Sequence, residues 1–123
     1  MINAIIVDDE QHSCKTLSAL LEKHCPEIKV LATCMNGAEG LKVIREQNPN
    51  LVFLDVEMPR MNGFDLTTKI RADKKLSEMP IILVTALQSR EDRERGMDAG
   101  ANAYIVKNSF DQSNLLEVMG RLT

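Results

Sequence analysis

The chain has 123 residues, of which 44% are hydrophobic and 27% are charged, and its formal net charge is −3. This is the composition of an ordinary globular protein, and the length suffices for one core, so we expect one domain over 1–123. The mild negative charge disfavours direct nucleic-acid binding, and the apolar runs are too short to cross a membrane. Because residues 1–4 contain no basic leader, we expect a cytoplasmic protein.

Three cysteines, Cys14, Cys25 and Cys34, lack the paired spacing of a disulfide framework or a zinc site. We therefore expect these thiols to be reduced and mostly buried. His12 and His24 are interpreted as surface residues near helix ends rather than as metal ligands.

The first half of the chain alternates buried apolar runs with amphipathic segments. Residues 4–7 are consecutive apolar residues, which is typical of a strand buried on both faces. Residues 13–25 instead carry apolar side chains at helical spacing, until Pro26 ends the helix. The same patterns predict strands at 4–7, 30–32 and 51–55 and helices at 13–25 and 36–47.

A loop that contains Pro59 and Gly63 separates the central strand from the second half of the chain. The segment 89–99 has six consecutive charged residues and little to bury. We expect its helix to be the least well anchored, with surface pairs such as Glu91 with Arg95. The second half predicts helices at 64–70, 89–99 and 109–122, the last with a capping box of Ser109 and Gln112, and strands at 80–85 and 103–106.

Five strands that alternate with five helices, without repeats or low-complexity tracts, are typical of an α/β domain. Right-handed crossovers then give a doubly wound, five-stranded parallel sheet, for which we expect the strand order 2-1-3-4-5. In such a sheet the functional crevice lies outside the carboxyl ends of the strands. Polar residues at the strand ends are therefore the candidates for function.

Polar side chains stand at the ends of four predicted strands, and they are Asp8 and Asp9, Asp55, Thr85 and Lys107. Carboxylates at about 4 Å repel one another by roughly 4 kcal/mol per pair at an effective dielectric near 20. A cation must offset that repulsion. Lys107 is one candidate. The other is Mg²⁺, with Mn²⁺ as a substitute, because an all-oxygen site that retains waters suits these ions.

The rim of the sheet that these strand ends form suits phosphoryl transfer. Asp55 can attack phosphorus and form an aspartyl phosphate, while Lys107 and a metal ion neutralise the transferring oxygens and Thr85 donates a hydrogen bond. The rim offers no histidine, serine elbow or other general base, so acyl hydrolysis is disfavoured. Taken alone, Asp55 is equally well interpreted as a strand-end residue that caps the following turn.

A longer set of motifs includes the acidic pair Asp8-Asp9, Asp55 followed by Met58-Pro59 and Gly63, Thr85-Ala86, and Gly100-Ala101 through Tyr104 to Lys107. Together they resemble the receiver domain of response regulators in two-component phosphorelay signalling, and chemotaxis receivers in particular. The resemblance covers essentially the whole chain. It implies the flavodoxin-like fold, with no output domain in these residues.

The resemblance implies that Asp55 accepts a phosphoryl group from a histidine kinase or phosphotransfer domain. Asp9, Asp55 and the backbone carbonyl of Glu57 would bind Mg²⁺. Asp8 would act on the ion mostly through water.

The resemblance also implies a switch. Thr85 would move towards the phosphoryl oxygens and Tyr104 would turn inward. The face formed by the fourth helix, the fifth strand and the fifth helix would then control a downstream effector or a fused domain. The domain would catalyse only its own phosphorylation and dephosphorylation. We expect a monomer that has no nucleic-acid or membrane partner. A weak dimer on phosphorylation stays an open alternative, which the apolar pattern of the fourth and fifth helices does not support.

The chain departs from the family at Asn108, where proline usually follows the lysine in a cis peptide. A non-proline cis bond costs about 3 kcal/mol, so we expect a trans Lys107–Asn108 bond. The part up to Gly63 resembles receivers of transcription factors, whereas 79–122 resembles receivers of chemotaxis hybrid kinases. The open alternatives are a degenerate or engineered receiver that binds partners without efficient phosphorylation, a phosphatase, and a flavin-binding module, which the acidic residues after the first strand disfavour.

Overall fold

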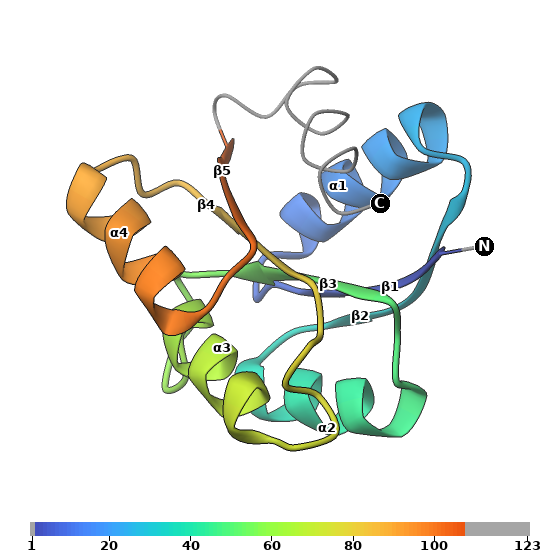
Figure 1. The fold of residues 1–123 in the computed structure, drawn as a ribbon. Coiled ribbons are helices and arrows are strands. Elements are labelled where there is room, and N and C mark those ends of the chain that lie inside the picture. Colours follow the sequence, from blue (N-terminus) through green and yellow to red (C-terminus); the bar gives the residue numbers. More distant parts are fainter. Residues whose placement is uncertain (1, 108–123) are drawn as a thin grey trace.

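A computed structural model describes residues 2–107, in which strands and helices alternate along the chain. The strands are β1 (Ile2–Val7), β2 (Ile28–Cys34), β3 (Leu51–Asp55), β4 (Ile81–Thr85) and β5 (Ala103–Val106), and the helices are α1 (Gln11–His24), α2 (Gly37–Gln47), α3 (Gly63–Ala72) and α4 (Arg90–Ala99). The strands form one parallel sheet in the order β2-β1-β3-β4-β5, which confirms the predicted α/β fold and strand order (Figure 1). The fifth predicted helix, 109–122, lies outside the described residues.

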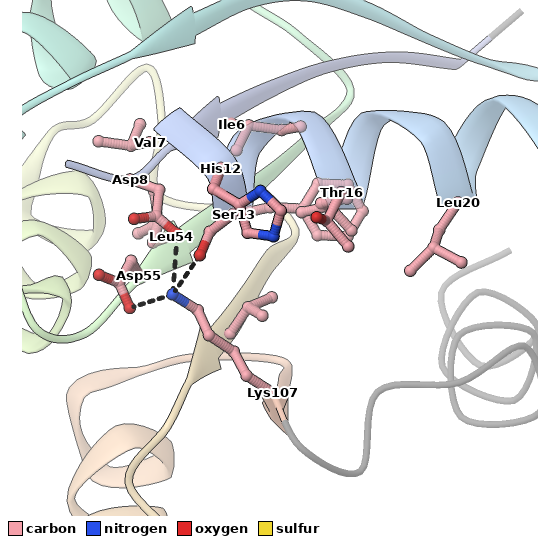
Figure 2. A pocket seen from close by; sticks show the side chains of 13 residues that line it. Ile6, Val7, Asp8, His12, Ser13, Thr16, Leu20, Leu54, Asp55 and Lys107 are labelled. Atoms are coloured by element: carbon pink, nitrogen blue, oxygen red, sulfur yellow. Dashed lines mark hydrogen bonds and ion pairs between the residues drawn. The ribbon is translucent and has the colours of Figure 1, made fainter. Parts of the chain in front are cut away.

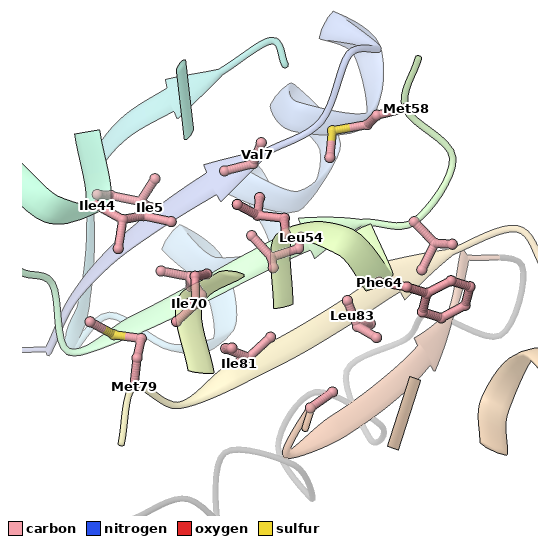
Figure 3. Packing of buried hydrophobic residues seen from close by; sticks show 14 of the residues in the cluster. Ile5, Val7, Ile44, Leu54, Met58, Phe64, Ile70, Met79, Ile81 and Leu83 are labelled. Atoms are coloured by element: carbon pink, nitrogen blue, oxygen red, sulfur yellow. The ribbon is translucent and has the colours of Figure 1, made fainter. Parts of the chain in front are cut away.

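Helices cover both faces of this sheet, with α1 on one face and α2 and α3 on the other (Figure 1). Successive strand residues alternate between two buried clusters. Ile6 and Phe53 belong to the cluster that includes α1, whereas Ile5 and Leu54 belong to the cluster with α2 and α3 (Figure 3). Each fully buried side chain of this size contributes about 1.5 to 3 kcal/mol. None of the helices within 2–107 has the length and hydrophobicity that a membrane span requires.

Helix α4 is the least buried helix, as predicted, and Gly96 is its one fully buried position. The predicted ion pair of Glu91 with Arg95 is not the one observed. Arg90 pairs with Glu94 at 2.9 Å instead, and the Arg95 guanidinium lies 4.6 Å from the centroid of the Phe64 ring on α3. Helical spacing allows both pairs, but the neighbouring aromatic ring gives the Arg95 guanidinium a cation–π contact instead.

The start of α3 lies directly against the end of β3 because Gly63 has no side chain. A Cβ atom at Gly63 would lie 2.5 Å from the carbonyl oxygen of Asp55. The Asn62 side chain accepts the Asp65 N–H at 2.9 Å and the Asp65 carboxylate accepts the Asn62 N–H, which forms a capping box. The Thr67 hydroxyl donates to the Gly63 carbonyl at 2.7 Å. These contacts fix the loop that follows Asp55.

Arg71 ties the starts of β4 and β5 together at the opposite end of the sheet. Its guanidinium donates to the carbonyl oxygens of Gly100 at 2.9 Å and Met79 at 2.6 Å. It also donates to the Asn102 side chain at 2.8 Å, and the same oxygen accepts the Ile81 N–H at 2.8 Å. This network fixes the position of β5, the strand that leads to Lys107.

The three cysteines are free and buried, which confirms the prediction. Burial raises the pKa of Cys14 to about 11, and the nearby charge of Asp8 adds to the effect. Burial likewise raises the pKa of Cys34 to about 11. These thiols therefore stay protonated, and hence unreactive, at neutral pH.

Candidate functional site

The carboxyl ends of four neighbouring strands bring the predicted polar residues to one rim. Asp8 follows β1, Asp55 ends β3, Thr85 ends β4 and Lys107 follows β5. Because the strands are parallel, all four positions lie at the same edge of the sheet. Figure 2 shows Asp8, Asp55 and Lys107 pointing towards one another at this rim.

Three carboxylates gather at the rim. Each of Asp8, Asp9 and Asp55 offers an oxygen that lies within 4.8 Å of the other two. Asp8 and Asp55 are buried and Asp9 is exposed. The Oδ1 atom of Asp8 also accepts the Glu10 N–H at 2.9 Å, so this strand-end aspartate caps a turn as well as facing the rim.

Lys107 supplies the positive charge at this rim. Its Nζ atom lies 3.0 Å from Asp8 Oδ2, 3.2 Å from Ser13 Oγ and 3.4 Å from Asp55 Oδ1 (Figure 2). Burial by itself would lower the pKa of Lys107. The hydrogen bond to Asp8 and the charges of both aspartates outweigh that effect, and the pKa is raised. Lys107 therefore stays charged at neutral pH.

Asp55 is the most perturbed group of the rim. Burial is the main cause that raises its pKa, to about 7, and the negative charge of Asp8 adds to it. Lys107 and the backbone N–H of Glu57 act in the opposite direction. Oδ1 of Asp55 forms only the long ion pair with Lys107 and has no hydrogen-bond donor among the described residues. A buried carboxylate oxygen in this state is available for a ligand.

The three aspartates fit a hard divalent cation. Their ligand atoms are all carboxylate oxygens, one of the three aspartates is exposed to water, and within residues 2–107 no hydrogen-bond donor reaches Asp55 Oδ1. Mg²⁺ prefers such oxygen ligands and keeps several of its waters. His12 and His24 do not join this cluster within residues 2–107. The side chain of Glu57 is exposed, and its carbonyl remains a predicted ligand.

Thr85 and Tyr104 meet at one residue, Leu87. The Thr85 hydroxyl oxygen accepts the Leu87 N–H at 3.2 Å, and the Tyr104 hydroxyl donates to the Leu87 carbonyl at 3.0 Å. The Tyr104 ring is already buried, with 8% of the residue exposed, and the Arg93 guanidinium lies 5.2 Å from its centroid. Tyr104 therefore already points inward in this structure, before the inward turn that the resemblance implies for phosphorylation.

Sequence reasoning missed Ser13 and Leu87. The apolar spacing marks Ser13 only as the start of a helix, and its partner Lys107 lies 94 residues away. Leu87 acts through its backbone, which carries no sequence signal. A cavity of about 200 Å³ also opens beneath Lys107, beside α1, and its apolar lining includes Leu17 and Phe53.

Sequence comparison gives some relatives that are about as long as this chain and others that are much longer. PilH of Pseudomonas aeruginosa is 33% identical over 119 residues, which cover 97% of this chain and 95% of PilH. Protein-glutamate methylesterase/protein-glutamine glutaminase 2 of Nitratidesulfovibrio vulgaris is 41% identical over 109 residues, which cover 87% of this chain. Those residues are 29% of the methylesterase, so the chain spans less than a third of that relative's length.

Comparison with solved structures also gives a signalling protein of similar fold. The chemotaxis protein CheY4 of Vibrio cholerae has a TM-score of 0.86 with this chain at 27% identity, and the match covers 100% of this chain and 99% of CheY4. The family model of the response regulator receiver domain matches residues 4–119. With its strand order, its acidic rim and these relatives, the chain belongs to the response regulator receiver domains of two-component signalling.

Proposed function

We propose that this receiver domain accepts a phosphoryl group on Asp55 and transmits the change to a partner. The observation that supports this best is Asp55 itself, a buried carboxylate with an oxygen that faces an ammonium group and has no hydrogen-bond donor in the described part of the chain. A buried polar oxygen without a partner is costly. A bond to phosphorus would give this oxygen the partner that it lacks.

The chemistry is a displacement at phosphorus. An oxygen of Asp55 forms the new bond to phosphorus, while the bond to the donor breaks, either to nitrogen in a phosphohistidine or to oxygen in acetyl phosphate. The leaving group keeps the electron pair of the broken bond, so acetate leaves as its anion, whereas the histidine nitrogen takes up a proton from water. The protein contributes placement and charge, because Lys107 and the hydroxyl of Thr85 can donate to phosphoryl oxygens.

Asp8, Asp9, Asp55 and the backbone carbonyl of Glu57 would hold Mg²⁺, or Mn²⁺ in its place. The three carboxylates lie close enough together to share one ion. When bound, the ion supplies positive charge against the negative charge of the transferring oxygens.

We further infer that residues 1–123 act in the cytoplasm as one monomeric receiver domain. Its phosphoryl donor is a histidine kinase or phosphotransfer domain, and its output is a separate effector or a fused domain. Among the relatives, PilH is about as long as this chain and the methylesterase is much longer, which supports both kinds of output. The domain catalyses only its own phosphorylation and dephosphorylation.

Incubation with acetyl phosphate and Mg²⁺ should add one phosphoryl group to the protein, because Asp55 is the buried carboxylate at which nucleophile, ammonium and metal ligands meet. Intact-mass spectrometry measures the addition. EDTA in place of Mg²⁺ should prevent it. Hydroxylamine cleaves acyl phosphates but spares phosphoserine and phosphothreonine, so it should remove the added group.

An unchanged mass in the presence of Mg²⁺ would contradict the proposal and favour a receiver that binds its partners without phosphorylation. Steady release of phosphate from an external phosphoester over many turnovers would instead favour a phosphatase.

Beryllofluoride with Mg²⁺ mimics an aspartyl phosphate and should shift the backbone amide resonances of Thr85, Leu87 and Tyr104. When the Thr85 hydroxyl turns to the new oxygens it gives up the Leu87 N–H, and Leu87 in turn holds Tyr104. Lys29, on the far edge strand β2, is the internal control and should keep its resonance. Unchanged resonances at Thr85 and Tyr104 would rule out this switch.

A further inference from the structure

We propose that Ser13 is a positioning residue that holds the ammonium group of Lys107 in place for phosphoryl transfer to Asp55. The inference rests on the proposed function and adds to it a residue of α1. Ser13 Oγ lies 3.2 Å from Lys107 Nζ, and Figure 2 shows the two side chains meeting at the rim.

The ammonium group has three N–H bonds, and the rim places three oxygen atoms from three different segments around it, of which two accept hydrogen bonds and the third forms the longer ion pair. They are Asp8 Oδ2 at 3.0 Å, Ser13 Oγ at 3.2 Å and Asp55 Oδ1 at 3.4 Å. Lysine carries its charge on a flexible four-carbon stem, so its head is fixed only by what it contacts. The two hydrogen bonds and the ion pair together restrict the position of Nζ.

Ser13 and Lys107 line the cavity beside α1 together with Asp8 and Asp55, and most of the other lining residues are apolar. They include Leu17, Phe53 and Val84. Without the serine oxygen, one N–H of the half-buried ammonium would face these side chains and lose a hydrogen bond. The head of Lys107 would then reorient towards the two carboxylates or towards water.

A hydroxyl at this position also has an electrostatic advantage over a carboxylate. It accepts a hydrogen bond without adding negative charge, so it holds the ammonium group and leaves its positive charge for the transferring phosphoryl group. Asp8 already forms the stronger, charge-assisted bond at 3.0 Å. Ser13 therefore sets the direction of the ammonium group more than its charge state.

Ser13→Ala should lower the rate of phosphorylation by acetyl phosphate at saturating Mg²⁺ by about three- to tenfold, the effect of losing one hydrogen bond of ordinary net strength. The Mg²⁺ concentration for half-maximal rate should not change, because Ser13 contributes no carboxylate. Ser13→Thr should restore the rate, since it keeps the hydroxyl and the cavity has room for one methyl group. Thr16→Ala is the matched control, because Thr16 lies on the same helix and lines the same cavity. Its rate should stay within about twofold of the unchanged chain.

A second measurement needs no phosphorylation. NMR of the Lys107 ammonium group should show greater mobility in Ser13→Ala than in the unchanged chain, and no difference in Thr16→Ala. An unaltered ammonium signal in Ser13→Ala, or equal loss of rate in the alanine and threonine variants, would overturn the positioning role. If the unchanged chain is not phosphorylated at all, the proposed function fails, and the ammonium signal still decides whether Ser13 holds Lys107.

Discussion

Asp55→Asn should take up no phosphoryl group from acetyl phosphate, and in metal-free buffer at about pH 7.5 it should be more stable than the unchanged chain. The first effect is expected because the amide of asparagine is not a nucleophile towards phosphorus. The second is expected because the Asp55 carboxylate is buried beside Asp8, which raises its pKa to about 7. Replacement by a neutral side chain of the same shape removes that unfavourable charge.

The pH dependence of this effect has a definite direction. The pKa of Asp55 is about 3.9 in an unfolded chain and about 7 in the folded one, so the folded state binds more protons between these values. The free energy of unfolding of the unchanged chain therefore falls as pH rises through this window. After allowance for relaxation of the surroundings around a buried charge, the gain from Asp55→Asn should be about 1 to 2 kcal/mol near pH 7.5 and should shrink towards zero near pH 4. Urea denaturation at the two pH values measures it.

Asp98→Asn is the matched control, because Asp98 is an exposed aspartate on α4. It should change the free energy of unfolding by less than about 0.5 kcal/mol. Added Mg²⁺ should stabilise the unchanged chain and leave Asp55→Asn almost unaffected, since a ligand stabilises only the folded state that binds it. Equal stability of the unchanged chain and Asp55→Asn at neutral pH would contradict the assignment of a buried, destabilising charge to Asp55.

Gly63→Ala should lower the free energy of unfolding by about 3 kcal/mol. The added Cβ would lie 2.5 Å from the Asp55 carbonyl oxygen and 2.9 Å from the Val56 Cα atom. Both are backbone atoms, so α3 and the end of β3 must move apart to make room. Because that movement displaces Asp55, the rate of phosphorylation should fall as well. Urea denaturation and the intact-mass assay measure the two effects.

Gly37→Ala provides the comparison for this substitution. Its Cβ would also make a close contact, at 2.9 Å, but with the side chain of Met61 rather than with backbone. The Met61 sulfur can rotate away, whereas the Met61 Cβ moves only with its loop, and alanine favours the helix, so the cost should be about 1 to 2 kcal/mol, less than at Gly63. Similar costs at the two glycines would show that the approach of α3 to Asp55 is not what Gly63 protects.

Continuous apolar runs made the central strands predictable. β3 and β5 have the bounds that the sequence predicts, because every residue in them is buried. β2 runs from Ile28 to Cys34 and is longer than the predicted 30–32. It is an edge strand in which exposed residues such as Lys29 and Thr33 interrupt the apolar pattern, and its length is set by pairing with β1. Hydrophobicity alone does not report that pairing.

The meeting of Asp8, Asp55 and Lys107 was predictable for a similar reason, because parallel strands deliver their ends to one edge. The contacts made by side chains from helices were not. Ser13 reaches Lys107, and Arg95 lies over Phe64 rather than beside Glu91. These contacts depend on how α1 and α4 pack on the sheet, and helical spacing fixes only which residues share a face.

The buried ring of Tyr104 affects the output that we expect from the unphosphorylated domain. The Tyr104 hydroxyl already donates a hydrogen bond to the Leu87 carbonyl, and the Arg93 guanidinium lies over the ring. To convert a two-state equilibrium from 1:99 to 99:1 takes about 5.5 kcal/mol of differential interaction. Because Tyr104 already points inward before phosphorylation, the phosphoryl group has to supply less than this free energy to activate the domain. The difference in output between the unmodified and the phosphorylated domain is correspondingly smaller. The unmodified domain should therefore already activate its effector to a basal level, which phosphorylation by the kinase increases.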